Sequence, residues 1–144
     1  MFIRTTAINK ILKLDKFVRG VQGGTSAGKT YAILPILIDI AAKNKQTDIS
    51  VVSESIPHLK RGCIKDFKKI MVDTGRWVDG RWNASDFKYN FANGSQIEFF
   101  SADSDAKLRG ARRDWLYMNE CNNIVFNAYN ELAMRTKNGI FLDW

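Results

Sequence analysis

The sequence has few of the residues from which metal centres and disulfide frameworks are built. It contains one histidine, His58, and two cysteines, Cys63 and Cys121, with no Cys-x-x-Cys pair. A cysteine- and histidine-ligated zinc site and a disulfide-rich extracellular fold are therefore excluded. We expect reduced thiols, and an ordinary core or surface role for each of these three side chains.

Long hydrophobic runs, repeats and Pro/Gly/Ser-rich linkers are also missing. No apolar run approaches the ~18 residues of a membrane span, and residues 1–10 lack the apolar core of a signal peptide. A length of 144 residues with 45% hydrophobic residues suits one packed core. We expect a single domain over residues 1–144, with no membrane contact and a cytoplasmic location.

Acidic residues are in deficit. The chain has 15 Asp and Glu residues against 22 Lys and Arg residues, which gives a formal net charge of +7. This basic balance favours a polyanionic partner, although the charge does not identify which one.

Hydrophobic periodicity predicts strands that alternate with helices. Asn93-Gly94 predicts the turn of an antiparallel hairpin, and Pro35 predicts a kink within an apolar helix. The alternation favours an α/β fold, with a mainly parallel central sheet sandwiched by helices and the hairpin as an insertion. The strands are predicted at 17–22, 48–53, 87–91, 96–100, 115–118 and 139–144, and the helices at 29–44, 57–74 and 124–137.

Residues 23–30 form a phosphate-binding motif. They read GGTSAGKT, which fits G-x-x-x-x-G-K-[ST] between a predicted strand and a predicted helix. The glycines let backbone N–H groups face a phosphate, Lys29 reaches the outer phosphates, and Thr30 can hold Mg²⁺. The motif therefore predicts ATP and Mg²⁺ as cofactors. The expected nucleotide-binding residues are Gln22, Gly23, Gly24, Thr25, Ser26, Ala27, Gly28, Lys29 and Thr30.

The segment 115–120, WLYMNE, predicts the second half of an ATP-hydrolysing site. Its bulky apolar residues predict a central strand, whose carboxyl end places Asn119 and Glu120 beside the phosphate loop. Glu120 is the expected general base for an attacking water. Asn119 stands where an Asp is usual, and we expect it to contact the metal through water without contributing charge.

These segments resemble the ATPase domain of the large terminase subunit of tailed bacteriophages. The matching pieces are GGTSAGKT at 23–30, KLRGARRD at 107–114 followed by YMNE at 117–120, and FLDW at 141–144. The resemblance implies a P-loop NTPase of the additional-strand, catalytic-glutamate type, in a branch that uses Asn-Glu. It implies catalytic roles for Lys29 and Glu120, and for Arg109 as a sensor of the γ-phosphate in its own or a neighbouring subunit.

The same resemblance implies a function in viral DNA packaging. The expected activity couples ATP hydrolysis to translocation of double-stranded DNA into a procapsid, in the cytoplasm of the bacterial host. The implied partners are double-stranded DNA, a portal protein, a small terminase subunit, and further copies of the chain in a ring. Thr25 stands where many terminases have Arg, and the sequence stops at Trp144, before the family's coupling segment and nuclease domain. We therefore expect this chain alone to be weakly active or inactive.

Two basic segments are candidates for DNA contact. On the helix predicted after Pro57, four basic residues share one face, and a solvated helix face explains them equally well. A second group precedes the strand at 115–118. The candidates are Arg61, Lys65, Lys68, Lys69, Arg112 and Arg113.

Two other functions share the phosphate loop. A small nucleotide or metabolite kinase would transfer the phosphoryl group to an acceptor instead of water. A nucleotide-binding interaction module would bind ATP without turnover.

Overall fold

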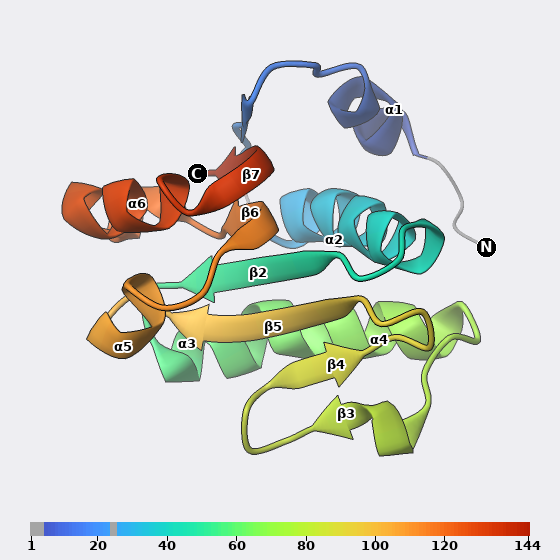
Figure 1. Ribbon diagram of the computed structural model, residues 1–144. Helices are drawn as coiled ribbons and strands as arrows, with labels where there is room; N and C mark the ends of the chain where they lie inside the picture. Colours follow the sequence, from blue (N-terminus) through green and yellow to red (C-terminus); the bar gives the residue numbers. More distant parts are fainter. Residues whose placement is uncertain (1–4, 24–25) are drawn as a thin grey trace.

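The computed structural model describes residues 5–23 and 26–144. Within them, one seven-stranded sheet has the order β1-β7-β6-β2-β5-β4-β3 (Figure 1). The first five strands of this order, β1, β7, β6, β2 and β5, are parallel to one another. The last two, β4 and β3, continue the sheet beyond β5 with antiparallel pairing. The strands are β1 Val18–Val21, β2 Asp48–Ser53, β3 Trp82–Asn83, β4 Lys88–Asn90, β5 Gln96–Ser101, β6 Arg113–Met118 and β7 Thr136–Asp143.

Helices cover both faces of the sheet. Val51, Tyr117 and Phe141 pack in the core beneath α1 to α4, whereas Val52 and Met118 pack on the other face beneath α5 and α6. No helix in the described part of the chain is long and apolar enough to cross a membrane. The helices are α1 Thr6–Leu12, α2 Ser26–Lys43, α3 Ile56–Leu59, the π-helix η1 Lys60–Ile64, α4 Lys65–Asp73, the 3-10 helices η2 Asp79–Arg81 and η3 Cys121–Asn123, α5 Asp105–Leu108 and α6 Phe126–Ala133.

The structure confirms the predicted α/β class and the inserted hairpin. β4 and β5 pair antiparallel with Tyr89 opposite Ile97, and Gly94 takes a φ of 87° in the turn, which a side chain would disfavour. β7 lies between β1 and β6, as the additional-strand arrangement requires. The expected helix through Pro35 is also present, as α2.

Three details differ from the sequence prediction. The helix predicted at 124–137 ends at Ala133, because Thr136 donates to the Leu132 carbonyl and the chain then pairs with β6 from Thr136 onward. The helix predicted at 57–74 contains a π-helical segment at Lys60–Ile64. The short elements α1, α5 and β3 were not predicted, because a segment of two to seven residues is too short to show a hydrophobic periodicity.

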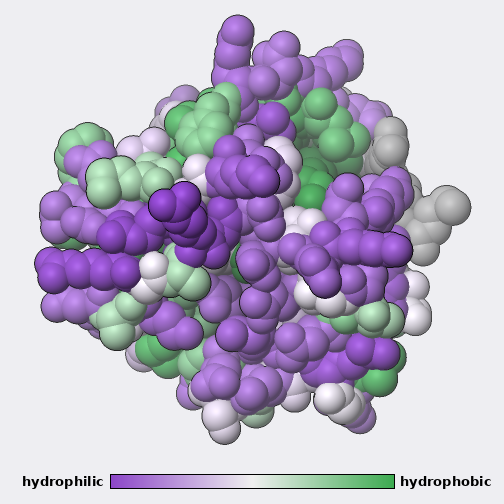
Figure 2. Space-filling model, in the orientation of Figure 1, coloured by the Kyte–Doolittle hydropathy of each residue, from purple (hydrophilic) through white to green (hydrophobic). Residues whose placement is uncertain are grey.

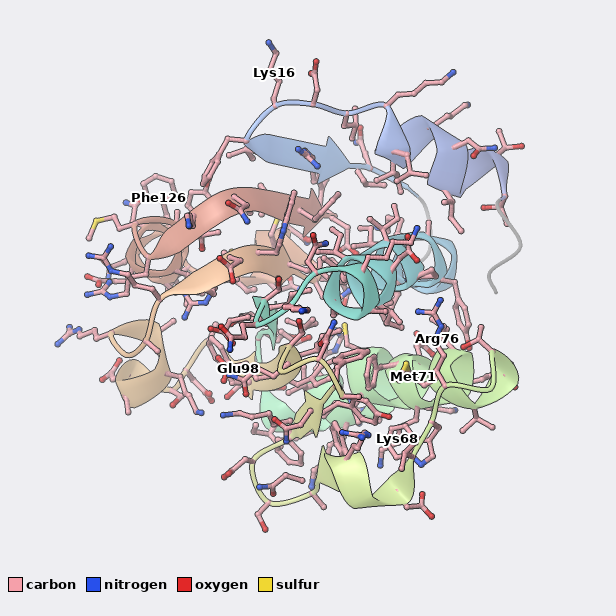
Figure 3. All side chains as sticks on the ribbon, turned by 45° about the vertical axis from the view of Figure 1, so that its right-hand side comes forward. Lys16, Lys68, Met71, Arg76, Glu98 and Phe126 are labelled. Atoms are coloured by element: carbon pink, nitrogen blue, oxygen red, sulfur yellow. The ribbon has the colours of Figure 1, made fainter. Side chains whose placement is uncertain are left out.

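Hydrophilic side chains cover most of the face seen in Figure 2, and hydrophobic ones form a few small groups. Two large apolar side chains at the start of α6 are exposed: Val125, the N-cap residue, at 70%, and Phe126 at 72%. Phe126 lies on the outer side of the helix in Figure 3 and stacks on Tyr129.

Candidate nucleotide site

The phosphate loop joins the carboxyl end of β1 to the amino end of α2. Gly24 and Thr25 lie outside the described residues, and for Ser26 and Ala27 only the backbone is described, as the start of α2. A Cβ at Gly23 would come within 3.2 Å of Lys29 Cδ, so glycine lets this lysine pack against the loop. The first turn of α2 therefore carries Gly28, Lys29 and Thr30 next to the end of β1, which is the arrangement of an anion-binding helix terminus.

Lys29 is buried at the base of this loop. Lys29 is 8% exposed. Its Nζ donates to the carbonyl oxygen of Gly23 at 3.2 Å and to that of Trp144 at 2.6 Å. Gly23 N–H also donates to the Trp144 carbonyl. The ammonium group thus lies where the ends of β1 and β7 meet. Gln22, the residue that follows β1, is exposed.

A buried polar cluster lies under the loop, at the carboxyl edge of the sheet. Tyr117, Asn119 and Asp143 alternate with apolar residues along β6 and β7, so all three face α2. The Thr30 hydroxyl lies 3.4 Å from the Tyr117 hydroxyl, and Ser53 Oγ at the end of β2 donates to Asn119 Oδ1 over 3.3 Å. Each of these five residues is at most 3% exposed.

Asp143 is the centre of the cluster, and the sequence analysis did not single it out. Its carboxylate accepts hydrogen bonds from the Tyr117 hydroxyl, from Asn119 Nδ2 at 3.3 Å and from the Glu120 backbone N–H. The residue is 0% exposed. Its signal in the sequence was an acidic residue closing the apolar strand at 139–144, next to the phosphate-loop strand.

Tyr117 is held in its protonated form. Burial, together with the nearby Cys63 and Asp143, raises the pKa of its hydroxyl well above the usual value. Tyr117 therefore acts as a hydrogen-bond donor to Asp143. Burial likewise raises the pKa of Cys63, and both cysteines are free thiols, as expected.

Glu120 begins the turn after β6, with a φ of 49° in the left-handed region. Its carboxylate pairs with Nε2 of His58, and the two side chains are 28% and 29% exposed. His58 stands in α3, whose first turn is capped by Ser55. The structure thus places His58 against the residue that is expected to be the general base. The contact was invisible in the sequence, because the two partners lie about 60 positions apart.

The basic residues of the helix after β2 differ in their surroundings. Lys69 pairs with Asp73 at 3.1 Å, and Lys68 lies 4.9 Å from the ring centre of Trp82. Arg61 and Lys65 are exposed, and their side chains form no ion pair or hydrogen bond with other described residues. Trp82 itself packs against Phe67 in an aromatic cluster, so its ring is engaged within the protein.

The basic residues before and at the start of β6 also differ in their exposure. Arg109 is exposed at the end of α5 and is not brought into contact with Lys29 or Glu120. Arg112 is exposed at the amino end of β6. Arg113 is 4% exposed, and its guanidinium donates to Ser50, Leu132 and Ala111, so we leave Arg113 out of the DNA contacts proposed below.

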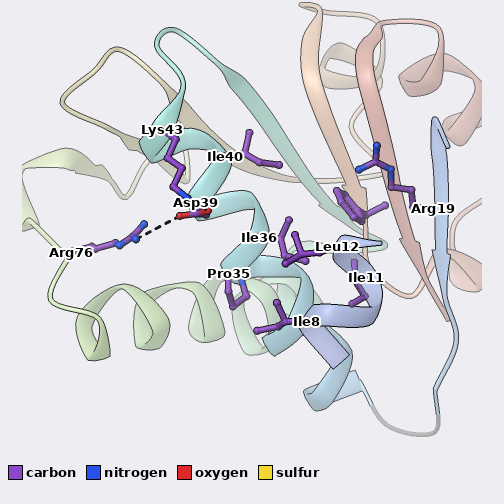
Figure 4. Close-up of a pocket in the computed structure, with 11 residues that line it drawn as sticks. Ile8, Ile11, Leu12, Arg19, Pro35, Ile36, Asp39, Ile40, Lys43 and Arg76 are labelled. Carbon is purple, nitrogen blue, oxygen red and sulfur yellow. Dashed lines mark ion pairs between the residues drawn. The ribbon is translucent and has the colours of Figure 1, made fainter. Parts of the chain in front are cut away.

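A cavity lies along the second half of α2. Its volume is about 640 Å³, and Figure 4 shows it between α1, the second half of α2 and Arg19. Asp39 at its rim pairs with Lys43 at 2.8 Å and with Arg76 at 3.9 Å. From Thr30 to Lys43 the helix rises about 20 Å, so this cavity is separate from the phosphate loop.

The strand order, the loop and the helix that follows it define a P-loop NTPase fold. Residues 15–141 match the family described as phage terminase large subunit. The chain belongs to this family. Among curated proteins, none matches the sequence.

Solved structures of large terminases share the fold. The large terminase of a thermophilic bacteriophage superposes with a TM-score of 0.77 at 15% identity, over 96% of this chain and 38% of that one. The same terminase in complex with ATP-gamma-S gives a TM-score of 0.76 at 14% identity, over 96% and 37%. The large terminase ATPase domain of Thermus phage P74-26 gives 0.72 at 14% identity, over 99% and 64%. The chain thus spans less than two fifths of the first of these terminases.

Proposed function

We propose that this chain is the ATPase domain of a viral DNA-packaging motor, which hydrolyses ATP to move double-stranded DNA into a procapsid. One observation carries the proposal: Lys29, Thr30 and the Asn119-Glu120 pair, separated by about 90 positions, gather at one edge of a P-loop NTPase sheet. In this proposal Lys29 neutralises the outer phosphates, and Glu120 takes the proton of the attacking water.

The residues at this edge fit ATP-bound Mg²⁺. Mg²⁺ prefers oxygen ligands and keeps several waters, and the edge offers the Thr30 hydroxyl with a buried carboxylate close behind it. No group of three or more His, Cys, Asp or Glu side chains that could hold a metal occurs among the described residues, so a metal held by protein alone is not supported. When bound with ATP, Mg²⁺ would neutralise phosphate charge, and Thr30 is the residue we propose to hold it.

The proposed partner on the surface is double-stranded DNA. Arg61 and Lys65 form no ion pair with a described acidic residue, and Lys68, Lys69 and Arg112 add to the basic surface. By family membership we also propose a portal protein, a small terminase subunit and further copies of the chain in a ring as partners, in the cytoplasm of the bacterial host. Arg109, exposed at the end of α5, would then act on a γ-phosphate in its own or a neighbouring subunit.

The test is ATP hydrolysis with and without duplex DNA, on this chain and on a longer protein that contains it. We expect phosphate release that DNA stimulates in the longer protein, and weak release from this chain. Transfer of the phosphoryl group to a small acceptor would instead indicate a kinase. ATP binding with no turnover in either protein would indicate a binding module.

A further inference from the structure

The carboxylate that is missing at position 119 lies on the neighbouring strand. Leu142 is opposite Met118 in the register of β7 and β6, so Asp143 lies beside Asn119 at the carboxyl edge. Asp143 is 0% exposed and accepts hydrogen bonds from Tyr117, Asn119 and Glu120. Burial of a charge is unfavourable unless other groups compensate it. Three donors therefore converge on the Asp143 carboxylate at the candidate site and can compensate a charge there.

Asn119 turns its amide nitrogen toward this carboxylate. Its Oδ1 accepts from Ser53 Oγ, whereas its Nδ2 donates to the Tyr117 oxygen and to Asp143, both over 3.3 Å. An amide NH₂ group is a donor only and cannot ligate a cation. The Asn119 side chain is thus occupied in orienting Asp143, and its oxygen points to β2.

Tyr117 connects Asp143 to the phosphate loop. Its hydroxyl has one proton, which it donates to Asp143. At the 3.4 Å contact with Thr30, the Tyr117 oxygen must therefore accept and the Thr30 hydroxyl must donate. This leaves the lone pairs of the Thr30 oxygen available to a cation.

We propose that Asp143, and not Asn119, supplies the negative charge of the Mg²⁺ site. The inference rests on the proposed ATP-dependent function and deepens it. Asn119 is then the residue this arrangement requires, since carboxylates at both positions would place two like charges about 3.3 Å apart in a buried site. The replacement of the usual Asp by Asn is matched by an acidic residue on the next strand.

The first test measures metal affinity directly. Mn²⁺ is titrated into protein and ATP and followed by electron paramagnetic resonance, for the unchanged chain and for Asp143→Asn. We expect Mn²⁺ affinity to fall about 10- to 100-fold in D143N, as for groups that support metal ligands, and ATP affinity in EDTA to stay unchanged. Asp103→Asn is the control, because Asp103 is exposed just beyond β5 and touches none of these residues.

Unchanged Mn²⁺ affinity in D143N, with ATP still bound, would overturn the inference alone. A chain that binds no ATP at all would overturn the proposed function together with it.

A second test exchanges the two side chains. The double variant Asn119→Asp with Asp143→Asn keeps one carboxylate and one amide, and we expect it to recover most of the Mn²⁺ affinity lost in D143N. The single variant N119D should lower the Tm without metal, and Mn²⁺ with ATP should raise its Tm more than that of the unchanged chain. If D143N fails to fold, the N119D variant provides the test. A Tm of N119D without metal that equals that of the unchanged chain would overturn the inference.

Discussion

The two ends of α2 differ in kind. At its amino end, small polar groups are closely hydrogen-bonded beneath the phosphate loop, from Thr30 through Tyr117 to Asp143. At its carboxyl end lies the cavity of about 640 Å³, lined mainly by apolar side chains such as Ile8 and Ile36. The first end holds buried hydroxyl, amide and carboxylate groups that bond to one another. The second end is an apolar cavity with charged side chains such as Asp39 and Lys43 among its lining.

The difference shows which features locate chemistry in this molecule. A phosphate loop binds its ligand with backbone N–H groups and one lysine at an exposed helix terminus, so a deep cavity is not needed. Buried polar side chains are costly and persist where a network satisfies them. The buried network of Thr30, Tyr117, Asn119 and Asp143 is therefore a better marker of the candidate site than the cavity of about 640 Å³.

Exchanging a lysine at each end of α2 by alanine gives the largest expected contrast. Lys29→Ala should weaken ATP binding by about 2 to 5 kcal/mol, or roughly 30- to 5,000-fold, because it removes the proposed charged partner of the phosphates. Lys43→Ala removes only the exposed pair with Asp39 and should leave ATP affinity unchanged. Calorimetric titration with ATP and Mg²⁺ measures both. Equal ATP affinity in the two variants would contradict the assignment of the phosphate loop.

The next contrast lies within the carboxyl edge. Glu120→Gln should retain ATP binding and lose turnover by ~10²-fold or more, because it removes the proposed general base. Glu54→Gln is the matched control, since Glu54 follows β2 at the same edge and is exposed. Single-turnover hydrolysis in the longer, active protein with saturating ATP and DNA provides the measurement. Normal turnover in E120Q would remove Glu120 as the base.

The sequence was sufficient to predict those parts of the candidate site that are formed by residues close together in the chain. The phosphate loop is contiguous, so GGTSAGKT identified it, and the strand ending at Met118 followed from four apolar residues. The order of strands followed less directly, through the resemblance to a family.

The contacts between distant segments could not be predicted in this way. Asp143 meets Asn119 because β7 lies beside β6, and His58 meets Glu120 because α3 follows the neighbouring strand β2. Neither pair has a spacing that periodicity reveals. That the Asn119 amide nitrogen faces the Asp143 carboxylate is likewise seen only in the structure.

The basic helix tests whether exposed charge binds DNA. If Arg61, Lys65, Lys68 and Lys69 each contact a phosphate, the logarithm of the binding constant should fall with log salt with a slope of about −3.6. Arg61→Ala with Lys65→Ala should reduce the slope by about 1.8. Lys16→Ala is the control, because Lys16 is exposed far from Lys68 in Figure 3. A slope that does not respond to the double variant would exclude this helix as the DNA contact.

The contact between His58 and Glu120 gives the smallest expected effect on rate. A polar contact exposed to this degree contributes up to about 1 kcal/mol, so His58→Ala should change single-turnover hydrolysis by about fivefold or less. His58→Asn, which keeps a side-chain donor, should change it less than H58A does.

A spectroscopic measurement sharpens this prediction. His58 is the only histidine of the chain, so an imidazole-labelled sample gives one set of ring signals by NMR. Because His58 Nε2 contacts the Glu120 carboxylate, E120Q should move these signals, and Glu54→Gln should leave them in place. Identical ring signals in E120Q and the unchanged chain would show that the pair does not form in solution. Glu120 would then be positioned by its backbone contacts to Asp143 and Asn123, and the loss of turnover in E120Q would have to arise without help from His58.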